Sequence, residues 1–220
     1  SHIEQKYLLD AFKSSWISSA GSYVGRFECA FGVNVSQTSY AVSVNSGTSA
    51  LHLALLALGV SEGDEVILPT FTMIASANAI RYCGATPVFV DAQIGTWNMD
   101  VAQIEERITK NTKAIMVVHV YGLPVDMDPV LELAKKYKLR VIEDAAEAHG
   151  AKYKGRSVGS MGDIAAFSLF ANKIITTGEG GMITTNNKQL AEAVSLLRNH
   201  AFGKHRHYWH ERVGYSYNMT

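Results

Sequence analysis

Two spacings of hydrophobic residues alternate along most of the chain. Apolar residues at intervals of three and four predict helices over 4–14 and 23–31. Short apolar runs, typical of buried strands, then alternate with further segments of helical spacing. The expected strands are 40–44, 65–68, 87–90, 114–120 and 139–143, and the expected helices are 48–58, 72–82, 101–108 and 127–137. Because strands that alternate with helices form parallel sheets covered on both faces, the pattern predicts an α/β fold of three layers, α-β-α, around a mainly parallel sheet.

Two more apolar runs, 163–169 and 181–185, follow with no helix between them. We expect these strands to depart from the parallel pattern, so that the sheet is mixed. The loop between them lies in the stretch FSLFANKIITTGEGG and carries Lys173. Ligands of open parallel sheets sit beyond the carboxyl ends of the strands, where loops leave for the helices. The loops expected to hold the chemistry are 45–49, 69–73, 144–147 and the Lys173 loop.

The composition narrows the classes of partner. Of the 220 residues, 47% are hydrophobic, enough for a well-buried core. The 20 Lys and Arg residues balance the 20 Asp and Glu residues, so no broad positive field favours nucleic acid or an anionic membrane surface. The apolar stretches are too short to span a membrane, and no signal-peptide pattern begins the chain. With only Cys29 and Cys83, in segments expected to be buried helices, we expect no disulfide framework and a cytoplasmic protein.

Gly47 and Thr48 open the expected helix after the first strand of the alternating pattern. Free backbone amides and the positive end of the helix dipole at such a turn suit a phosphate group. An ordinary helix cap is the alternative, since Ser and Thr are preferred at that position. The turn matches neither the dinucleotide pattern G-x-G-x-x-G nor the P-loop pattern, so it gives no support to nicotinamide or ATP binding.

Asp144 follows the apolar run Leu139–Ile142 at the carboxyl end of a strand. A carboxylate there is suited to a cationic nitrogen, and partial burial would strengthen the pairing. Capping of a following helix is an alternative role for Asp144. The neighbouring Glu143 and Glu147 are either solvated or accept hydrogen bonds from a ligand.

Lys173 stands between an apolar run and the glycine cluster Gly178–Gly181. A lysine in an apolar loop can act as a nucleophile toward a carbonyl group and form a Schiff base. The alternative is a surface lysine on a flexible glycine turn. Phosphate donors, an acid for a pyridinium nitrogen and an imine-forming lysine are together what pyridoxal 5′-phosphate (PLP) requires, so the three sites favour PLP as cofactor.

Several longer stretches carry a resemblance to a known family. They are SVNSGTSALHLALLALGVSEGDEVILPTFT, GATPVFVD, VVHVYGLPVDMD, VIEDAAEAHGAKYKG, GDIAAFSLFANKIITTGEGGMITT and GYSYNMT. In order and spacing they resemble the large domain of the DegT/StrS family of nucleotide-sugar aminotransferases, PLP-dependent enzymes of fold type I. The resemblance covers nearly all 220 residues. It implies that residues 1–220 are the PLP-binding large domain with its N-terminal helices, and that the family's smaller C-terminal domain is absent from this chain.

The resemblance also implies roles for single residues. Lys173 would be the catalytic residue and form the Schiff base, Asp144 would pair with the pyridinium nitrogen, and Glu147 would lie near the 3′-oxygen of the cofactor. The implied phosphate contacts are Gly47, Thr48 and Ser168, with Asn218 reaching the phosphate of the partner chain in a homodimer. No metal ligand is implied.

Two positions depart from the family pattern. Met73 stands where an aromatic residue usually stacks on the cofactor ring, and a thioether can only pack against that ring. In GYSYNMT, Ser216 and Asn218 stand where many relatives have Asn and Arg. The first departure implies weaker packing on the cofactor, and the second weakens the assignment of Asn218.

The implied activity is transfer of an amino group from glutamate to the C4 keto carbon of a nucleotide-linked keto-deoxysugar, with pyridoxamine 5′-phosphate as the intermediate form of the cofactor. The stretch RNHAFGKHRHYWHERVGYSYNMT resembles the GDP-perosamine synthase branch of the family, whose substrate is GDP-4-keto-6-deoxymannose. Two roles are open for the residues His205, Arg206, Tyr208, Trp209 and His210: recognition of a nucleotide sugar, and a structural loop or dimer contact. The alternatives to the aminotransferase are a PLP-dependent sugar dehydratase, against which the lysine at 173 argues, and a PLP-binding regulatory or inactive protein without turnover.

Overall fold

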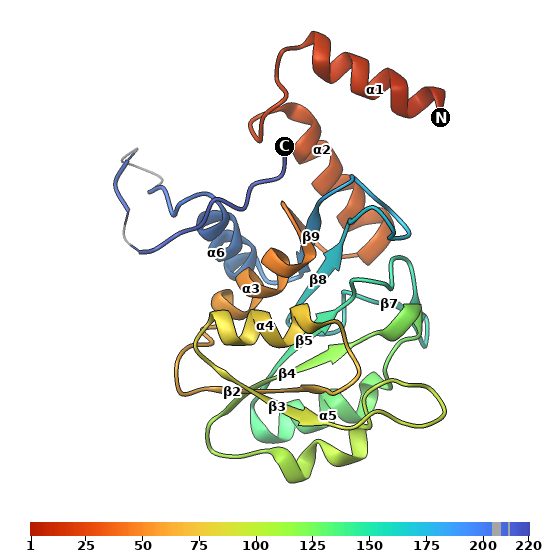
Figure 1. Cartoon of the computed structure of the whole chain (residues 1–220), viewed down its shortest axis with the longest axis vertical. Helices are drawn as coiled ribbons and strands as arrows, with labels where there is room; N and C mark the ends of the chain where they lie inside the picture. Colours follow the sequence, from red (N-terminus) through yellow and green to blue (C-terminus); the bar gives the residue numbers. More distant parts are fainter. Residues whose placement is uncertain (204–207, 211) are drawn as a thin grey trace.

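A seven-stranded sheet forms the centre of the computed structural model, which describes residues 1–203, 208–210 and 212–220 (Figure 1). The strand order is β1-β9-β8-β5-β4-β2-β3. The strands are β1 (Tyr40–Val44), β2 (Glu65–Pro69), β3 (Thr86–Val90), β4 (Thr112–Val118), β5 (Arg140–Asp144), β8 (Ile164–Ser168) and β9 (Gly181–Thr185). Strand β9 runs antiparallel to both β1 and β8, whereas the pairs from β8 to β3 are parallel. The mixed, mainly parallel sheet confirms the predicted fold class.

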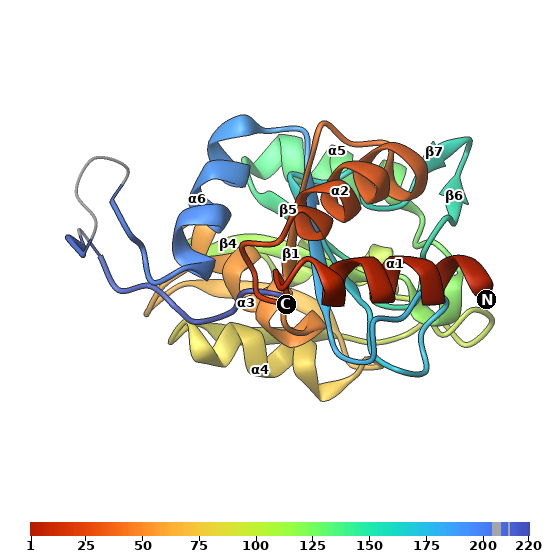
Figure 2. The same cartoon turned by 90° about the horizontal axis from the view of Figure 1, so that it is seen from above.

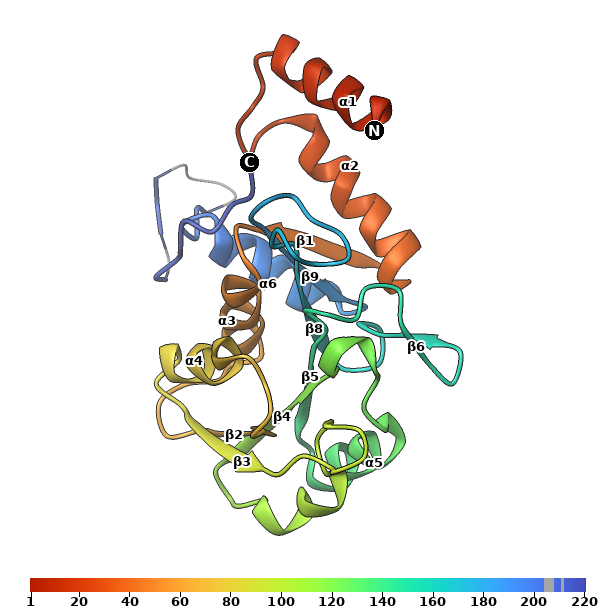
Figure 3. The same ribbon diagram turned by 45° about the vertical axis from the view of Figure 1, so that its right-hand side comes forward.

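Helices cover both faces of this sheet and complete the three layers (Figure 3). They are α1 (His2–Lys13), α2 (Ser22–Phe31), α3 (Gly47–Ala57), α4 (Ile74–Tyr82), α5 (Met127–Tyr137) and α6 (Lys188–Arg198). One hydrophobic core joins the sheet to α3, α4 and α6, and the other joins it to α2 and α5. Side chains of β8 alternate between them: Ala166 belongs to the α3 core and Phe167 to the α2 core. This alternation decides which way each side chain at a strand end points.

Helix α1 lies away from the sheet, beside α2 (Figures 1 and 2). It has no buried residue, and Leu8 and Phe12 are about 70% exposed. The N-cap Ser1 and Glu4 form a capping box that defines its first turn. The helix is therefore held by its capping box and by contacts with α2, such as the hydrogen bond from the Tyr23 hydroxyl to Asp10, and not by burial against the sheet.

The structure corrects the predicted helix over 101–108. This segment forms two short 3₁₀ turns, η2 (Val101–Gln103) and η3 (Glu105–Arg107). Ile108 is already extended, with φ −74° and ψ 125°, so the segment ends before it reaches the length at which a helix becomes cooperative. The buried Ile104 still anchors it to the core on the α5 face.

Three other features were absent from the predictions or differ from them. Helix α6 was not predicted, although Asn187 caps it and Ala191, Val194 and Leu197 bury one face. A small hairpin of β6 (Lys152–Tyr153) and β7 (Arg156–Ser157) was also missed, because two-residue strands carry no periodicity. Cys29 is exposed and not buried, and both cysteines are free. No helix in the described part of the chain is long and apolar enough to cross a membrane.

Candidate active site

The turn between β1 and α3 leaves backbone amides free at the carboxyl edge of the sheet. Ser46 is the N-cap of α3: its Oγ accepts from the Ser49 amide, and Ser49 Oγ accepts from the Ser46 amide, both at 3.1 Å. Helix capping, left open by the sequence, is therefore the role of Ser46 and Ser49. The amides of Gly47 and Thr48 begin the helix, where they have no intrahelical acceptor and lie at the positive end of the dipole.

Ser168, the last residue of β8, lies directly against this turn. A Cβ atom at Gly47 would come within 2.9 Å of Ser168 Cβ, and one at Gly181 within 2.3 Å of the Ser46 carbonyl oxygen. Only glycine tolerates approaches this close, so both positions need it. The Ser168 side chain lies on the α3 side of the sheet, two residues after Ala166. The structure thus brings Gly47, Thr48 and Ser168 together at one corner of the sheet.

Asp144, the last residue of β5, points to the same face of the sheet and is 4% exposed. Its Oδ2 accepts from Ser76 Oγ of α4 at 2.7 Å, and its Oδ1 accepts from the Ala146 amide at 3.2 Å. Turns and no helix follow over 145–150, so the helix-capping alternative is wrong. Burial raises the pKa of the Asp144 carboxyl above its ordinary value, against the lowering by the Ser76 hydroxyl and the Ala146 amide. The ionised form would be stabilised by a cation, as a pyridinium nitrogen provides.

Glu143 is neither solvated nor open to a ligand, which overturns both alternatives left by the sequence. It is fully buried on the opposite face of the sheet and accepts from the Gly159, Met161 and Gly162 amides at 2.7 to 2.8 Å. His119 Nε2 lies 3.1 Å from Glu143 Oε2. Burial alone would raise the pKa of Glu143, but the hydrogen bonds from His119 and the backbone amides outweigh it and lower that pKa. Glu143 is therefore a structural carboxylate.

Lys173 and Glu147 meet in front of the strand ends. Lys173 Nζ donates to Glu147 Oε1 at 3.0 Å, and the lysine side chain is 17% exposed. The alternative of a surface lysine on a flexible turn therefore fails. The second carboxylate oxygen of Glu147, Oε2, accepts from the Tyr121 amide at 3.2 Å. Glu147 thus fixes the amine of Lys173 to the turn that follows β4.

Two of the predicted site residues have partly different surroundings. Met73 is the N-cap residue of α4 and is 76% exposed, so its thioether packs little against the chain itself. Asn218 donates through Nδ2 to Asn199 Oδ1 at 2.9 Å, and no hydrogen bond within the described residues links it to Lys173 or Ser168. Its role toward a partner chain stays a prediction.

The loop expected to recognise a nucleotide sugar is only partly described. His205 and Arg206 lie outside the described residues. Tyr208 and Trp209 are exposed, and His210 Nδ1 lies 2.6 Å from the His200 carbonyl oxygen. The choice between a recognition loop and a structural loop therefore stays open.

Three residues near the strand ends were missed from the sequence. Ser76 is fully buried and links Asp144 to Thr72, whose Oγ1 is 2.8 Å from Ser76 Oγ. His119 accepts from the Val125 amide through Nδ1, so the ring proton is on Nε2 and points to the Glu143 carboxylate. His149 is 8% exposed, and within the described residues neither ring nitrogen has a hydrogen-bond partner. For Ser76, the spacing of four residues from Thr72 was the one sequence feature that could have indicated the contact between these two side chains.

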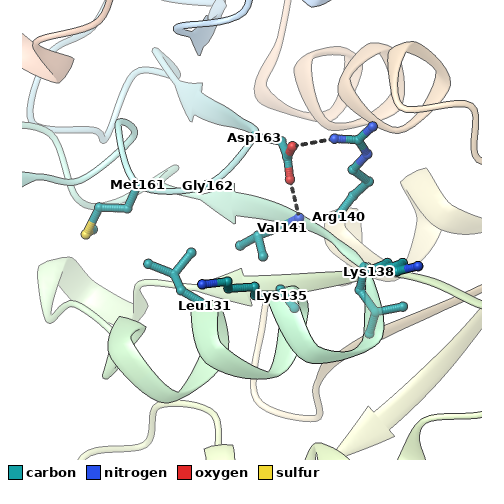
Figure 4. Close-up of a pocket in the computed structure, with 10 residues that line it drawn as sticks. Leu131, Lys135, Lys138, Arg140, Val141, Met161, Gly162 and Asp163 are labelled. Atoms are coloured by element: carbon teal, nitrogen blue, oxygen red, sulfur yellow. Dashed lines mark hydrogen bonds and ion pairs between the residues drawn. The ribbon is translucent and has the colours of Figure 1, made fainter.

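A cavity outside the candidate site lies at the other edge of the sheet. It measures about 500 Å³ and is lined by the end of α5, the start of β5 and the turn that precedes β8 (Figure 4). Arg140 Nη1 and the Val141 amide both bond Asp163 in its wall, at 2.9 and 2.8 Å. Because β5 separates its first residue, Arg140, from its last, Asp144, this cavity is distinct from the candidate site.

Comparison with known proteins identifies the relatives of this chain. The profile of the DegT/DnrJ/EryC1/StrS aminotransferase family matches residues 1–220. The GDP-perosamine synthase of Escherichia coli O157:H7 is 55% identical over 217 residues, which cover 99% of this chain and 59% of that protein. The chain therefore spans about three fifths of the length of the curated relatives it matches.

Solved structures agree with the family profile. An aminotransferase from Psychrobacter cryohalolentis superposes with a TM-score of 0.94 and 39% identity, over 100% of this chain and 58% of that one. A Streptococcus pneumoniae protein described as a sugar aminotransferase, in its PLP form, gives a TM-score of 0.93 and 33% identity over 100% of this chain and 61% of that one. PLP, the cofactor predicted from the sequence, is thus the cofactor of a solved relative. This chain belongs to the DegT/DnrJ/EryC1/StrS aminotransferase family.

Proposed function

We propose that this protein binds PLP through Lys173 and transfers an amino group from glutamate to the C4 keto carbon of a nucleotide-linked keto-deoxysugar. One observation carries the proposal. The Lys173–Glu147 pair, the buried Asp144 carboxyl and the turn at Gly47 and Ser168 come from three separate segments and meet at the carboxyl edge of one sheet. A phosphate, a cationic nitrogen and a carbonyl carbon on a single small molecule would match these three groups.

The donor set fits PLP group by group. The free amides of Gly47 and Thr48 and the hydroxyl of Ser168 would hold the phosphate, at the positive end of the α3 dipole. Asp144 would hold the ring nitrogen, whose charge would stabilise the buried carboxylate. PLP supplies an aldehyde that binds amines and a ring that withdraws electrons from them.

Lys173 would act both as the attachment point and as the proton carrier. Its Nζ is held at 3.0 Å from Glu147 Oε1, and its charge is close enough to Asp144 to act against the rise in the pKa of that carboxyl. Once an incoming amine releases it, Nζ is a base within a largely buried site and would move a proton on and off the reacting carbon. Asp144 would keep the ring nitrogen protonated throughout, because a nearby carboxylate favours the charged form of that nitrogen.

The proposed sugar rests on similarity to relatives. The similarity to a GDP-perosamine synthase supports GDP-4-keto-6-deoxymannose as the acceptor. We further propose that the protein acts as a homodimer, in which Asn218 contacts the phosphate in the site of its partner chain.

Two measurements test the proposal. Protein loaded with PLP should show the absorbance of a protein-bound Schiff base, and borohydride should fix the cofactor to the peptide that carries Lys173. The same absorbance in Lys173→Ala would contradict the assignment. Mass spectrometry of products from glutamate and a panel of GDP-, UDP- and dTDP-linked 4-keto-sugars then tests the reaction. A PLP-loaded protein that aminates no member of the panel would instead support a binding protein without turnover.

A further inference from the structure

Three aromatic side chains gather beside the candidate site. Phe71 follows β2, Trp97 follows β3 and Tyr121 follows β4, so all three extend from the carboxyl ends of neighbouring strands. The Phe71 ring centroid lies 5.1 Å from that of Trp97 and 6.4 Å from that of Tyr121. Trp97 is 59% and Tyr121 is 80% exposed, although both side chains are large and mostly apolar. We call these three residues the aromatic shelf.

The backbone of the shelf is held in an unfavourable conformation. Trp97 has φ +61° and Tyr121 has φ +48°, values in the left-handed region that bulky residues rarely adopt. The buried Asn98 donates through Nδ2 to the carbonyl oxygens of Leu123 and Pro124, and its Oδ1 accepts from the Val120 amide. Asn98 therefore ties the loop of Trp97 to the turn of Tyr121. Strained backbone that is fixed in this way is typical of ligand-binding segments.

The shelf is joined to the catalytic lysine by two hydrogen bonds. The Tyr121 amide donates to Glu147 Oε2 at 3.2 Å, and Glu147 Oε1 accepts from Lys173 Nζ at 3.0 Å. The backbone of Tyr121 is therefore two hydrogen bonds away from the Lys173 amine, which places the shelf beside the position where Lys173 would act on a carbonyl carbon.

We propose that the aromatic shelf binds the pyranose ring of the substrate, with the Trp97 ring against its C–H face. The inference rests on the proposed function, since it assigns the sugar part of the nucleotide sugar to a surface of the same site. Aromatic rings pack well on apolar surfaces such as the C–H face of a pyranose, and the exposed Trp97 and Tyr121 add an N–H and an O–H group. Within the described residues, neither of these two groups has a hydrogen-bond partner, so both are available to sugar hydroxyls.

Binding to the PLP-loaded protein separates the sugar from the base. The probes are a nucleoside diphosphate and the matching nucleoside-diphosphate hexose, whose C4 hydroxyl prevents amination, taken from the GDP, UDP or dTDP pair that the unmodified protein binds. Trp97→Ala should weaken binding of the hexose compound by about tenfold and leave binding of the free diphosphate unchanged. Ile94→Ala is the matched control, because Ile94 lies in the same loop, is 97% exposed and is not one of the three shelf residues.

Each other outcome overturns the proposal. Equal weakening of both probes would mean that the shelf stacks on the base. No weakening would mean that it contacts neither, and a change in subunit number by sedimentation would make it a contact between chains. If the unmodified protein binds none of the three hexose compounds, the nucleotide-sugar assignment itself fails, and the shelf proposal with it.

Kinetics distinguish failure of the shelf from failure of the proposed function. In Trp97→Ala the KM for the keto-sugar should rise about tenfold, while the rate at which glutamate converts the bound cofactor stays unchanged. An unmodified protein that turns over while Trp97→Ala keeps its KM would refute the shelf alone. An unmodified protein without turnover on any keto-sugar would refute the proposed function, whatever the shelf binds.

Discussion

Two neighbouring carboxylates at the end of β5 are buried to a similar degree but differ in their hydrogen-bond partners and in the direction of their pKa shifts. Glu143, on the α5 side of the sheet, is surrounded by three backbone amides and His119, all from within the chain. Asp144, on the α3 side, has one serine hydroxyl and one amide, and burial raises its pKa. The chain thus satisfies the first carboxylate completely and leaves the second with capacity for a charged partner.

This difference separates structural from functional acids more clearly than burial does. Buried polar groups are normally satisfied within the protein, so an acid that retains unused acceptor capacity is the candidate for binding. The α3 face also carries Ser168 and the free amides of α3, whereas the α5 face presents the Glu143 cluster. Substitutions should therefore impair activity on the first face and stability on the second.

The largest effect is expected for Lys173→Arg. Arginine keeps the positive charge beside Glu147 but stays protonated and forms no imine, so it can neither attach the cofactor nor move a proton. We expect turnover to fall by about 1000-fold or more. The melting temperature of the cofactor-free protein should stay close to that of the parent. Lys110→Arg, on an exposed turn, is the matched control, and equal losses in both variants would contradict the role of Lys173.

Glu143→Gln should be the most destabilising change among these predictions. The amide group of glutamine would place N–H donors against backbone N–H donors in a fully buried site. We expect the free energy of unfolding at pH 7 to fall by about 3 kcal/mol, measured in urea. Because the folded pKa of Glu143 is lowered, its stabilising contribution is present above the ordinary value of 4.5 and is lost as the pH falls through the folded pKa. A variant as stable as the parent at pH 7 would contradict the structural role of Glu143.

Asp144→Asn should act in the opposite sense on stability. Its folded pKa is raised, so the ionised group destabilises the cofactor-free protein as the pH rises from 3.8 through that pKa. The variant lacks this cost and should be at least as stable as the parent at pH 7. Turnover should nevertheless fall by about 100-fold, because the ring nitrogen would lose its anionic partner. Denaturation and activity measured on the same preparations would expose the contrast, and parallel losses of both would refute it.

Much of this arrangement was predictable from the sequence. The apolar runs located the strands, and the parallel topology placed their carboxyl ends at one edge, which is why Asp144 and Lys173 were found. The period of two residues along β5 also implies that Glu143 and Asp144 point to opposite faces. Which of the two faces holds the site depends on contacts with α4 and with the turns at 159–162, far away in sequence. Ser76 and His119 were missed for the same reason.

The predicted helix over 101–108 was wrong for a different reason. Its apolar residues have helical spacing, yet the segment is too short to form a cooperative helix, and the extended Ile108 redirects it toward β4. The left-handed backbone conformation of Trp97 and Tyr121 could not be predicted either, because neither tryptophan nor tyrosine favours it. Local pattern therefore predicts elements well, and tertiary contacts decide the strained turns around the site.

The smallest expected effect concerns Met73, which lies on the α3 side of the sheet, the side that holds Asp144. Its side chain is 76% exposed in front of α4, at the position where the resemblance to the family implies an aromatic residue. Met73→Phe should slow dissociation of PLP by about 3- to 10-fold, since a ring–ring contact contributes roughly 0.5–1.5 kcal/mol beyond area burial. Ile74→Phe, one residue further on and 64% exposed, is the matched control, because it adds the same ring within α4. A gain in Met73→Phe alone would mean that the α3 face is completed by the cofactor ring. An equal gain in both variants would mean that the effect comes only from added hydrophobic area. No gain in either variant would mean that the cofactor ring does not lie near the start of α4.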